Sequence, residues 1–296
     1  MNPKTKIRRL LASEGFYDFR RNIFAVTGAL IIVVFFVTAL IGTNLVPQNP
    51  YNLAELDLMD SYIPPLWEDG GDPRFLLGTD EQGRDMVSAI VYGIRMSVQV
   101  GFFVTVICIV VGTTLGLIAG YKGGKVDSFI TGVINIQLSF PSLLIAMLVL
   151  IAFGRGVWKI IFALSFSGWV QYARTVRGAV MAERNKEYVE AAKVIGFPER
   201  TILSRHILPN VLTPVVVMAT LQISKAILNE ATLSFLGIGV PITEPSLGLL
   251  VAQGYEVLFS GLWWVSVFPG LVLMLFVFGI NLLGDFLRDE FNPRLK

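Results

Sequence analysis

Few residues of this chain have side chains that could carry chemistry. It has 296 residues, with one histidine, His206, and one cysteine, Cys108, and no nucleophile-and-base motif. No G-x-x-x-x-G-K-[ST] sequence occurs, which excludes the usual ATP site. Asp80, Glu81 and Asp85 lie close together, but their spacing matches no calcium loop, and capping or solvation accounts for them better. We therefore predict no catalytic residue, no metal site and no cofactor in this chain.

A second polar group interrupts an apolar segment, where Lys225, Asn229 and Glu230 lie within six residues. Charges inside a membrane span are costly, so they pair, line a cavity or lie near an end. One interpretation is that they contribute to a translocation path. The candidates for that path are Asn135, Gln137, Lys225, Asn229 and Glu230. The alternative is that they pair with polar side chains of neighbouring helices, such as Asn281, and hold the bundle together.

The longest polar stretch between apolar segments is residues 187–210, EYVEAAKVIGFPERTILSRHILPN. We predict a short helix from Lys186 to Ile195, with Asn185 as its N-cap. Gly196 supplies a left-handed residue after it, and Pro198 begins a second helix. That second helix is predicted to end at Pro209.

The first of these helices has a narrow apolar stripe. Tyr188, Ala191, Ala192 and Ile195 fall at i, i+3, i+4 and i+7, and the two alanines make the stripe flat. Glu187 and Glu190 flank it with negative charge. This pattern indicates a docking surface for another protein. The alternative is an amphipathic helix that rests on lipid headgroups.

The composition indicates an integral membrane protein, since 54% of the residues are hydrophobic, only 16% are charged and the mean hydropathy is +0.66. We predict a cytosolic tail (1–22), a first transmembrane helix (23–46), an extracytoplasmic loop with an amphipathic helix (47–96), a core of five further transmembrane helices (97–287) that includes a cytosolic loop (181–210), and a cytosolic tail (288–296). The core spans are placed at 98–120, 128–153, 157–180, 211–240 and 263–287.

Lysine and arginine set this orientation, because cytoplasmic loops of membrane proteins are enriched in both residues. Residues 47–96 contain only three of them against nine carboxylates, which suits the outer side. Arg155 and Lys159 are the exception, since they fall at a turn that the topology places outside. Pro141 is expected to kink the span in which it lies.

Several motifs resemble one transporter family. Glu190-Ala191-Ala192, Gly196 and Leu208-Pro209 resemble the EAA loop of the binding-protein-dependent ABC transporter permeases. The segments LGTDEQGRD (77–85), PSLG (245–248) and NLLGDFLRD (281–289) resemble its dipeptide, oligopeptide and nickel branch, in particular the C-type permease subunit. His206 departs from the family pattern, which usually has isoleucine at that position.

The resemblance implies an all-α fold of six transmembrane helices, that of a type I ABC importer permease, in the inner membrane of a bacterium. It implies coupling to a cytosolic ATPase through Glu187, Tyr188, Glu190, Ala191, Ala192, Ile195, Gly196, Arg205, His206 and Pro209. The implied partners are a second permease, two ATPase subunits that bind ATP and magnesium, and an extracytoplasmic solute-binding protein. The implied function is uptake of peptides or related small solutes by alternating access. The alternative is a self-sufficient secondary transporter or channel, which would more often have inverted repeats and several intramembrane acids.

Overall fold

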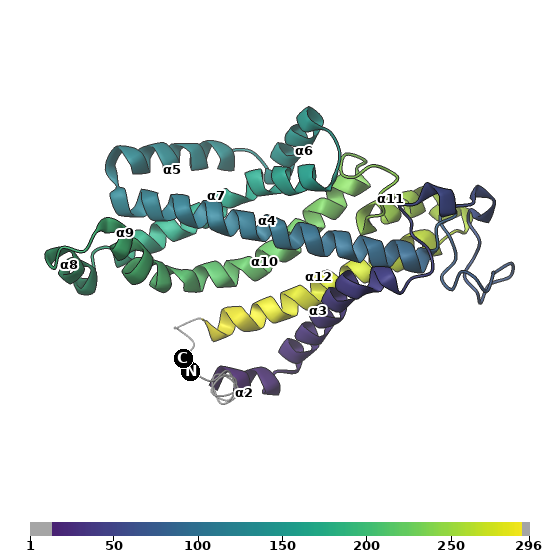
Figure 1. Cartoon of the computed structure of the whole chain (residues 1–296), viewed down its shortest axis with the longest axis horizontal. Helices are drawn as coiled ribbons and strands as arrows, with labels where there is room; N and C mark the ends of the chain where they lie inside the picture. Colours follow the sequence, from purple (N-terminus) through teal and green to yellow (C-terminus); the bar gives the residue numbers. More distant parts are fainter. Residues whose placement is uncertain (1–13, 292–296) are drawn as a thin grey trace.

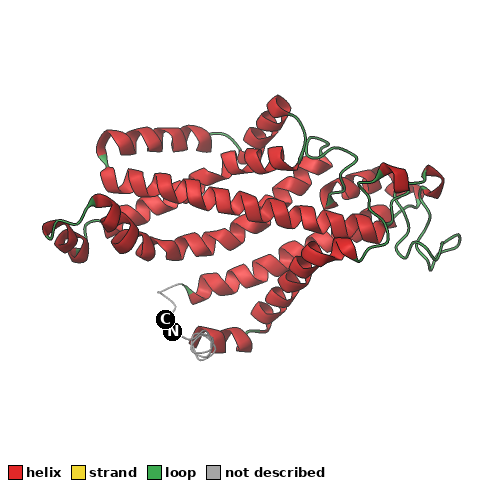
Figure 2. Ribbon diagram, viewed as in Figure 1, coloured by secondary structure: helices red, strands yellow, loops and turns green. Residues whose placement is uncertain are grey.

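The structure is a computed structural model that describes residues 14–291, so most of the first predicted tail and the end of the second lie outside the described residues. In this part of the chain the structure is helical, and its single β-bridge joins Thr79 to Asp85 (Figure 2). The helices are α2 (Glu14–Arg21), α3 (Ile23–Ile41), α4 (Met86–Lys122), α5 (Gly124–Leu138), α6 (Ser142–Phe153), α7 (Val157–Glu183), α8 (Glu187–Val194), α9 (Glu199–Thr201), α10 (Leu208–Phe235), α11 (Leu247–Val257) and α12 (Trp264–Glu290).

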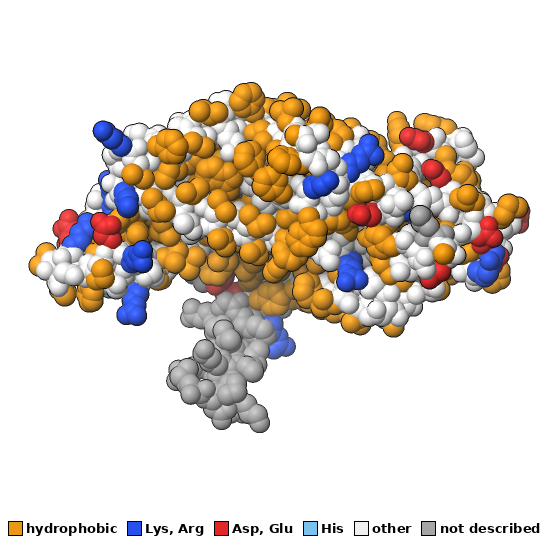
Figure 3. Space-filling view, turned by 45° about the horizontal axis from the view of Figure 1, so that its top comes forward, with side chains coloured by type: hydrophobic (Ala, Val, Ile, Leu, Met, Phe, Trp, Pro, Cys, Tyr) orange, Lys and Arg blue, Asp and Glu red, His pale blue; other side chains and the backbone are white. Residues whose placement is uncertain are grey.

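The long helices lie side by side along the molecule (Figure 1). Successive members of the set α3, α4, α5, α7, α10 and α12 run in alternating directions, so α8 lies at one end. We call this end the α8 end. The irregular chain of residues 45–85 and α11 lie at the other, which we call the loop end. Hydrophobic side chains cover most of the middle of the molecule, and charged side chains gather towards the two ends (Figure 3).

Four helical segments of the described chain are long and apolar enough to cross a membrane, namely those that contain α3, α4, α10 and α12. The count becomes five if α5 and α6 form one broken span. The α7 helix has 27 residues but is less apolar, because it carries Lys159, Arg174 and Arg177. The prediction of a helical membrane protein is confirmed at this level.

The α4 helix joins two elements that were predicted separately, the amphipathic helix before residue 97 and the span from residue 98. It runs without a break for 37 residues, which corresponds to about 55 Å. The carboxylate of Asp85 caps its first turn by accepting from the backbone N–H of Ser88 at 2.8 Å. A bilayer core is only about 30 Å thick, so α4 extends well beyond it.

Glycines spaced by four residues bring α4 against α7. A Cβ added at Gly112, Gly116 or Gly120 would lie within 2.4–2.8 Å of atoms of Tyr172, Ala173 or Arg177 and its neighbours on α7. Without side chains these three positions let the two backbones approach closely, as small residues do at helix contacts in membranes. This Gly-x-x-x-Gly-x-x-x-Gly pattern was not among the features predicted from the sequence.

The chain breaks at Pro141 more sharply than a kink. The predicted span 128–153 is instead two helices, α5 and α6, which are bent by 88°. Proline lacks an N–H and disfavours helical geometry at the residue before it, so Ser139 and Phe140 leave the helix. The chain therefore bends at Pro141 as predicted, but the bend separates two helices instead of kinking one.

Candidate functional site

The α8 helix and the turn after it are set by local sequence. Glu187 and Glu190 lie in its first turn and Lys193 in its last, which suits the helix dipole. Gly196 has φ +86°, and its N–H donates to the carbonyl of Lys193 at 3.0 Å, as predicted for a left-handed residue after the helix. Lys186 rather than Asn185 occupies the N-cap, and it makes no side-chain capping bond.

The two faces of α8 differ from the predicted stripe. Val189 and Ala192 are buried in the main hydrophobic core of the bundle, with 0% and 3% of their surface exposed. Val194 and Ile195 are 88% and 72% exposed, and Ala191 is exposed as well. The predicted docking stripe was therefore wrong at Ala192, because the side chain of this alanine packs against the core of its own chain. The outward apolar face of α8 consists of Ala191, Val194 and Ile195.

Tyr188 connects α8 to both neighbouring helices. Its hydroxyl donates to the Glu183 carboxylate at 2.5 Å and accepts from the Asn210 amide at 3.0 Å. Burial raises the pKa of Tyr188, and the bond to Glu183 raises it further. Tyr188 thus holds α8 against the end of α7 and the start of α10.

The predicted end of a helix at Pro209 is wrong. Residues Ile202–Ile207 form a π-helical turn in which the Leu208 N–H donates to the Leu203 carbonyl, and α10 continues directly to Phe235. A proline ring collides with the carbonyl four residues earlier in a regular α-helix, and the widened turn relieves this collision. Pro209 therefore lies inside a continuous helical segment.

His206 and Arg205 lie on this π-helical turn. The His206 side chain is half-buried, with its ring centroid 5.8 Å from that of Phe197. The backbone carbonyl of His206 accepts a hydrogen bond from the Asn210 side-chain amide at 2.7 Å. Arg205 is exposed. These contacts give His206 a packing role within the loop.

Glu230 lies at the centre of a buried polar cluster. It is fully buried, and its carboxylate accepts hydrogen bonds from Ser234 at 2.8 Å, Ser246 at 2.9 Å and Ser97 at 3.5 Å. The three hydroxyls come from α10 itself, from the start of α11 and from α4. Glu230 therefore joins these helices, although its partners are serines rather than the amides that the sequence analysis considered.

The other polar candidates for a path do not gather at one place. Lys225 is exposed and Asn229 is half-buried on α10. The Asn135 side chain is exposed, while the Gln137 amide donates to the Phe166 carbonyl. Asn281 accepts from Ser224 at 2.8 Å, so it links α12 to α10.

The GTDEQGRD motif forms a clamp at the loop end. Arg84 is fully buried, and its Nε lies 2.6 Å from a carboxylate oxygen of Asp80, which is buried too. The rest of the Arg84 guanidinium donates to the Ile242 carbonyl at 3.3 Å and to the Gln253 side chain at 3.2 Å. The motif thus ties residues 78–85 to the segment before α11 and to α11. No group of three or more potential metal ligands occurs in the described part of the chain.

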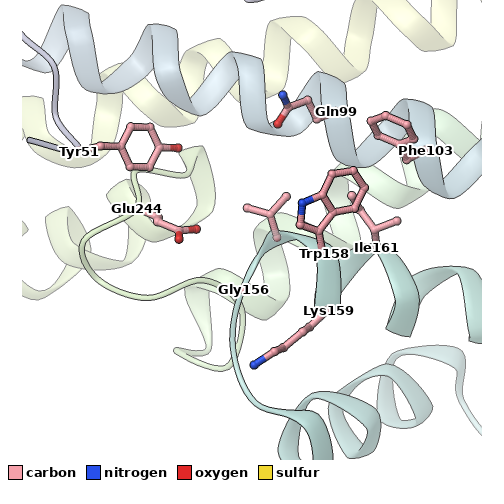
Figure 4. Close-up of a pocket in the computed structure, with 9 residues that line it drawn as sticks. Tyr51, Gln99, Phe103, Gly156, Trp158, Lys159, Ile161 and Glu244 are labelled. Atoms are coloured by element: carbon pink, nitrogen blue, oxygen red, sulfur yellow. The ribbon is translucent and has the colours of Figure 1, made fainter.

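A cavity of about 470 Å³ opens at the loop end, beside the start of α7 (Figure 4). Its wall includes Tyr51, Gln99 and Phe103, the first residues of α7 and Glu244. Burial, followed by the charge of Glu244, raises the pKa of Tyr51 to about 12. None of the predicted path residues lines this cavity. Its walls come from four separate segments, so no periodic pattern in the sequence indicates it.

Long apolar helices with a short helix projecting at one end are typical of a multi-pass membrane protein. The sequence matches the family described as binding-protein-dependent transport system inner membrane component over residues 112–296. Residues 11–65 match the N-terminal transmembrane domain of oligopeptide transport permease C. The chain belongs to this family of inner membrane components, and it is a multi-pass permease rather than an enzyme.

Similar proteins cover nearly the whole chain. A dipeptide transport system permease protein of Haemophilus influenzae is 37% identical over 294 residues, which are 99% of this chain and 97% of the relative. One of Escherichia coli is 40% identical over 283 residues, 96% of this chain and 93% of the relative. An oligopeptide transport system permease protein of Bacillus subtilis is 34% identical over 97% of this chain and 90% of the relative.

The fold is also similar to a solved structure. A chain of the MetNI methionine ABC transporter in an inward-facing conformation matches with a TM-score of 0.55 and 20% identity, over 69% of this chain and 96% of that chain. At this identity the likeness shows the fold alone.

Proposed function

We propose that this chain is the permease subunit of an ATP-driven importer that takes up di- or oligopeptides by alternating access. The observation that carries the proposal is the outward apolar face of α8, which remains uncovered at the end of a membrane-type bundle. Large exposed apolar side chains held in water mark a site for a partner protein. The names of the relatives support peptides as the solute class.

The proposed coupling surface combines Ala191, Val194 and Ile195 with the flanking carboxylates of Glu187 and Glu190. Gly196 ends α8 so that this face stays free, while Tyr188 holds the helix against the end of α7 and the start of α10. Arg205 is exposed beside it. In this proposal the surface binds a cytosolic ATPase subunit, and the ATPase subunits bind ATP and magnesium.

The complete transporter would contain a second permease, two ATPase subunits and an extracytoplasmic solute-binding protein. The proposed topology has six spans, with α7 and the broken pair α5–α6 among them and with both termini in the cytosol. Support comes from the alternating directions of α3, α4, α5, α7, α10 and α12 (Figure 1). The α8 end is then cytosolic, and the loop end faces outwards.

Thiol labelling in intact cells tests this topology. Single cysteines are placed at Asp57, Thr243 or Arg200, all of which are exposed, in a Cys108→Ser background. An impermeant reagent is expected to label the first two positions and to leave the one at Arg200 unlabelled until the cells are opened. Labelling at Arg200 in intact cells would reverse the orientation.

The purified chain alone is expected neither to bind nor to hydrolyse ATP, because its sequence has no P-loop. The assembled transporter is expected to hydrolyse ATP and to accumulate radiolabelled di- or trialanine in proteoliposomes. Equilibrium binding of ATP and phosphate release are measured for both preparations. ATP turnover by the chain alone would remove it from the permease class.

A further inference from the structure

The cavity at the loop end carries two opposite charges that have no partner of their own. Lys159 and Glu244 both line it, and within the described residues neither side chain forms an ion pair or a hydrogen bond. The Lys159 ammonium lies above Gly154, where an added Cβ would sit 3.1 Å from it. Figure 4 shows Glu244 beside Tyr51 on one wall and Lys159 on another segment, at the start of α7.

The presence of Lys159 here is unexpected on topological grounds. Lysine and arginine are enriched on the cytoplasmic side of membrane proteins, yet the proposed topology places Lys159 outside. Lys159 lines the same cavity as the Glu244 carboxylate, which is unpaired in the described part of the chain, so a role in ligand binding would explain a lysine at this position. The two charges match a ligand that carries both an ammonium and a carboxylate group.

The dimensions also fit a small zwitterion. Cavities of 300–1,000 Å³ are typical of small-molecule sites, and this one has about 470 Å³. An extended chain of two residues spans about 7 Å, so a short peptide fits within such a space. The Tyr51 phenol and the Gln99 amide add polar groups to the same wall.

An aromatic surface continues from the cavity towards the middle of the molecule. Trp158 and Phe103 form part of the wall, with ring centroids 5.3 Å apart. Trp158 and Ile161 also line a second, almost entirely apolar cavity of about 400 Å³, which runs along α4 and α7 past Phe162 and Phe166. Apolar burial is non-directional, so this surface accepts side chains of different shapes.

We propose that Lys159 and Glu244 bind the terminal carboxylate and the terminal ammonium of the transported peptide as it enters the membrane path, while Trp158 and Phe103 contact its side chains. This inference rests on the proposed function of peptide uptake. In this inference the permease recognises the charged termini of the peptide, and an apolar surface of the permease contacts the peptide side chains.

The test uses the complete transporter in proteoliposomes, with radiolabelled di- and trialanine and with the solute-binding protein titrated up to a saturating concentration. Lys159→Gln and Glu244→Gln are each expected to lower the maximal uptake rate by roughly tenfold or more, as expected when a charge-assisted hydrogen bond is lost. Lys159→Arg is expected to retain most of the uptake, because it keeps the charge.

Two neighbouring substitutions serve as matched controls. Arg155→Gln removes a cation from the same turn, and Glu256→Gln removes an exposed carboxylate from α11, but neither residue lines the cavity. Both controls are expected to transport like wild type.

Three results separate the possible failures. If wild type takes up neither peptide, the proposed function fails, and the inference fails with it. If wild type takes up peptide and both Lys159→Gln and Glu244→Gln match it, the inference is overturned and the proposed function stands. If these variants only raise the concentration of binding protein needed for half-maximal uptake, the two charges bind that protein rather than the peptide, which also overturns the inference.

Discussion

Val194→Lys on α8 is expected to release the ATPase subunits from the transporter and to abolish uptake. Val194 is 88% exposed, so the substitution does not disturb the packing of the chain. Lysine also has a better helix propensity than valine and suits the end of a helix, so α8 itself is retained. Burying the ammonium in an apolar contact at a central interface residue costs about 2–4 kcal/mol. This loss corresponds to a dissociation constant that is roughly 30- to 1,000-fold higher.

The measurement is the binding affinity of purified ATPase subunits for the permease pair, together with uptake by the complex. Met59→Lys is the matched control, since Met59 is 89% exposed but lies at the loop end. It is expected to leave ATPase binding at the wild-type level. Ala191→Trp should weaken binding by a steric route. Wild-type affinity in both Val194→Lys and Ala191→Trp would show that α8 is not the coupling surface.

Ala192→Trp would be a misleading substitution for the same purpose. The sequence pattern alone placed Ala192 on the docking stripe, but its side chain lies in the core beside Val189. Overpacking of a core site destabilises a protein by typically about 1–3 kcal/mol. A loss of uptake in Ala192→Trp would therefore reflect misfolding around α8 rather than a lost contact with the ATPase.

Arg84→Met is expected to destabilise the loop end by about 3–5 kcal/mol, because it leaves the buried Asp80 carboxylate without its cation. The double substitution Arg84→Met with Asp80→Asn is expected to recover much of this loss. Asparagine keeps an oxygen that can accept from the backbone N–H groups of Gln82 and Arg84, as the Asp80 carboxylate does at 2.9 and 3.0 Å. The double variant therefore buries no unpaired charge.

Thermal unfolding of the assembled complex measures these differences. Arg95→Met is the control, since Arg95 is exposed and makes one hydrogen bond, to Thr43 at 3.2 Å. It is expected to change the stability by no more than about 0.5 kcal/mol. If the stability losses of Arg84→Met and Asp80→Asn simply added in the double variant, the Arg84 and Asp80 side chains would not be energetically coupled.

Hydropathy predicted the helices that face an apolar surrounding, because such helices must be apolar along most of their length. It therefore located α3, α10 and α12 within a few residues. It did not predict that α4 continues without a break from Met86, since the amphipathic first turns and the apolar remainder have different patterns. It also did not predict the 88° bend after α5, because a proline in a sequence reveals a weak point but not the angle.

The site was less predictable than the fold, for a physical reason. Helical spacing correctly identified α8 and its terminating Gly196, since both depend on nearby residues. Which face of α8 is buried depends on tertiary packing. Helical spacing therefore could not show that the Ala192 side chain packs into the core. The serine partners of Glu230 and the walls of the cavity at the loop end come from segments far apart in the chain, so no local pattern could reveal them.

The unbroken α4 helix has a mechanical consequence. Its first turn lies beside the Arg84 clamp at the loop end, and its last turns contact α7 close to α8. A rigid rod of about 55 Å that tilts by about 5° about one end displaces its other end by roughly 5 Å. At Gly112, Gly116 and Gly120 the backbones of α4 and α7 pack directly against each other, so no α4 side chain separates them at these three positions. In the proposed topology α4 therefore connects the end where the ATPase is proposed to bind with the loop end, and a small tilt of this one helix moves one end by several ångströms relative to the other.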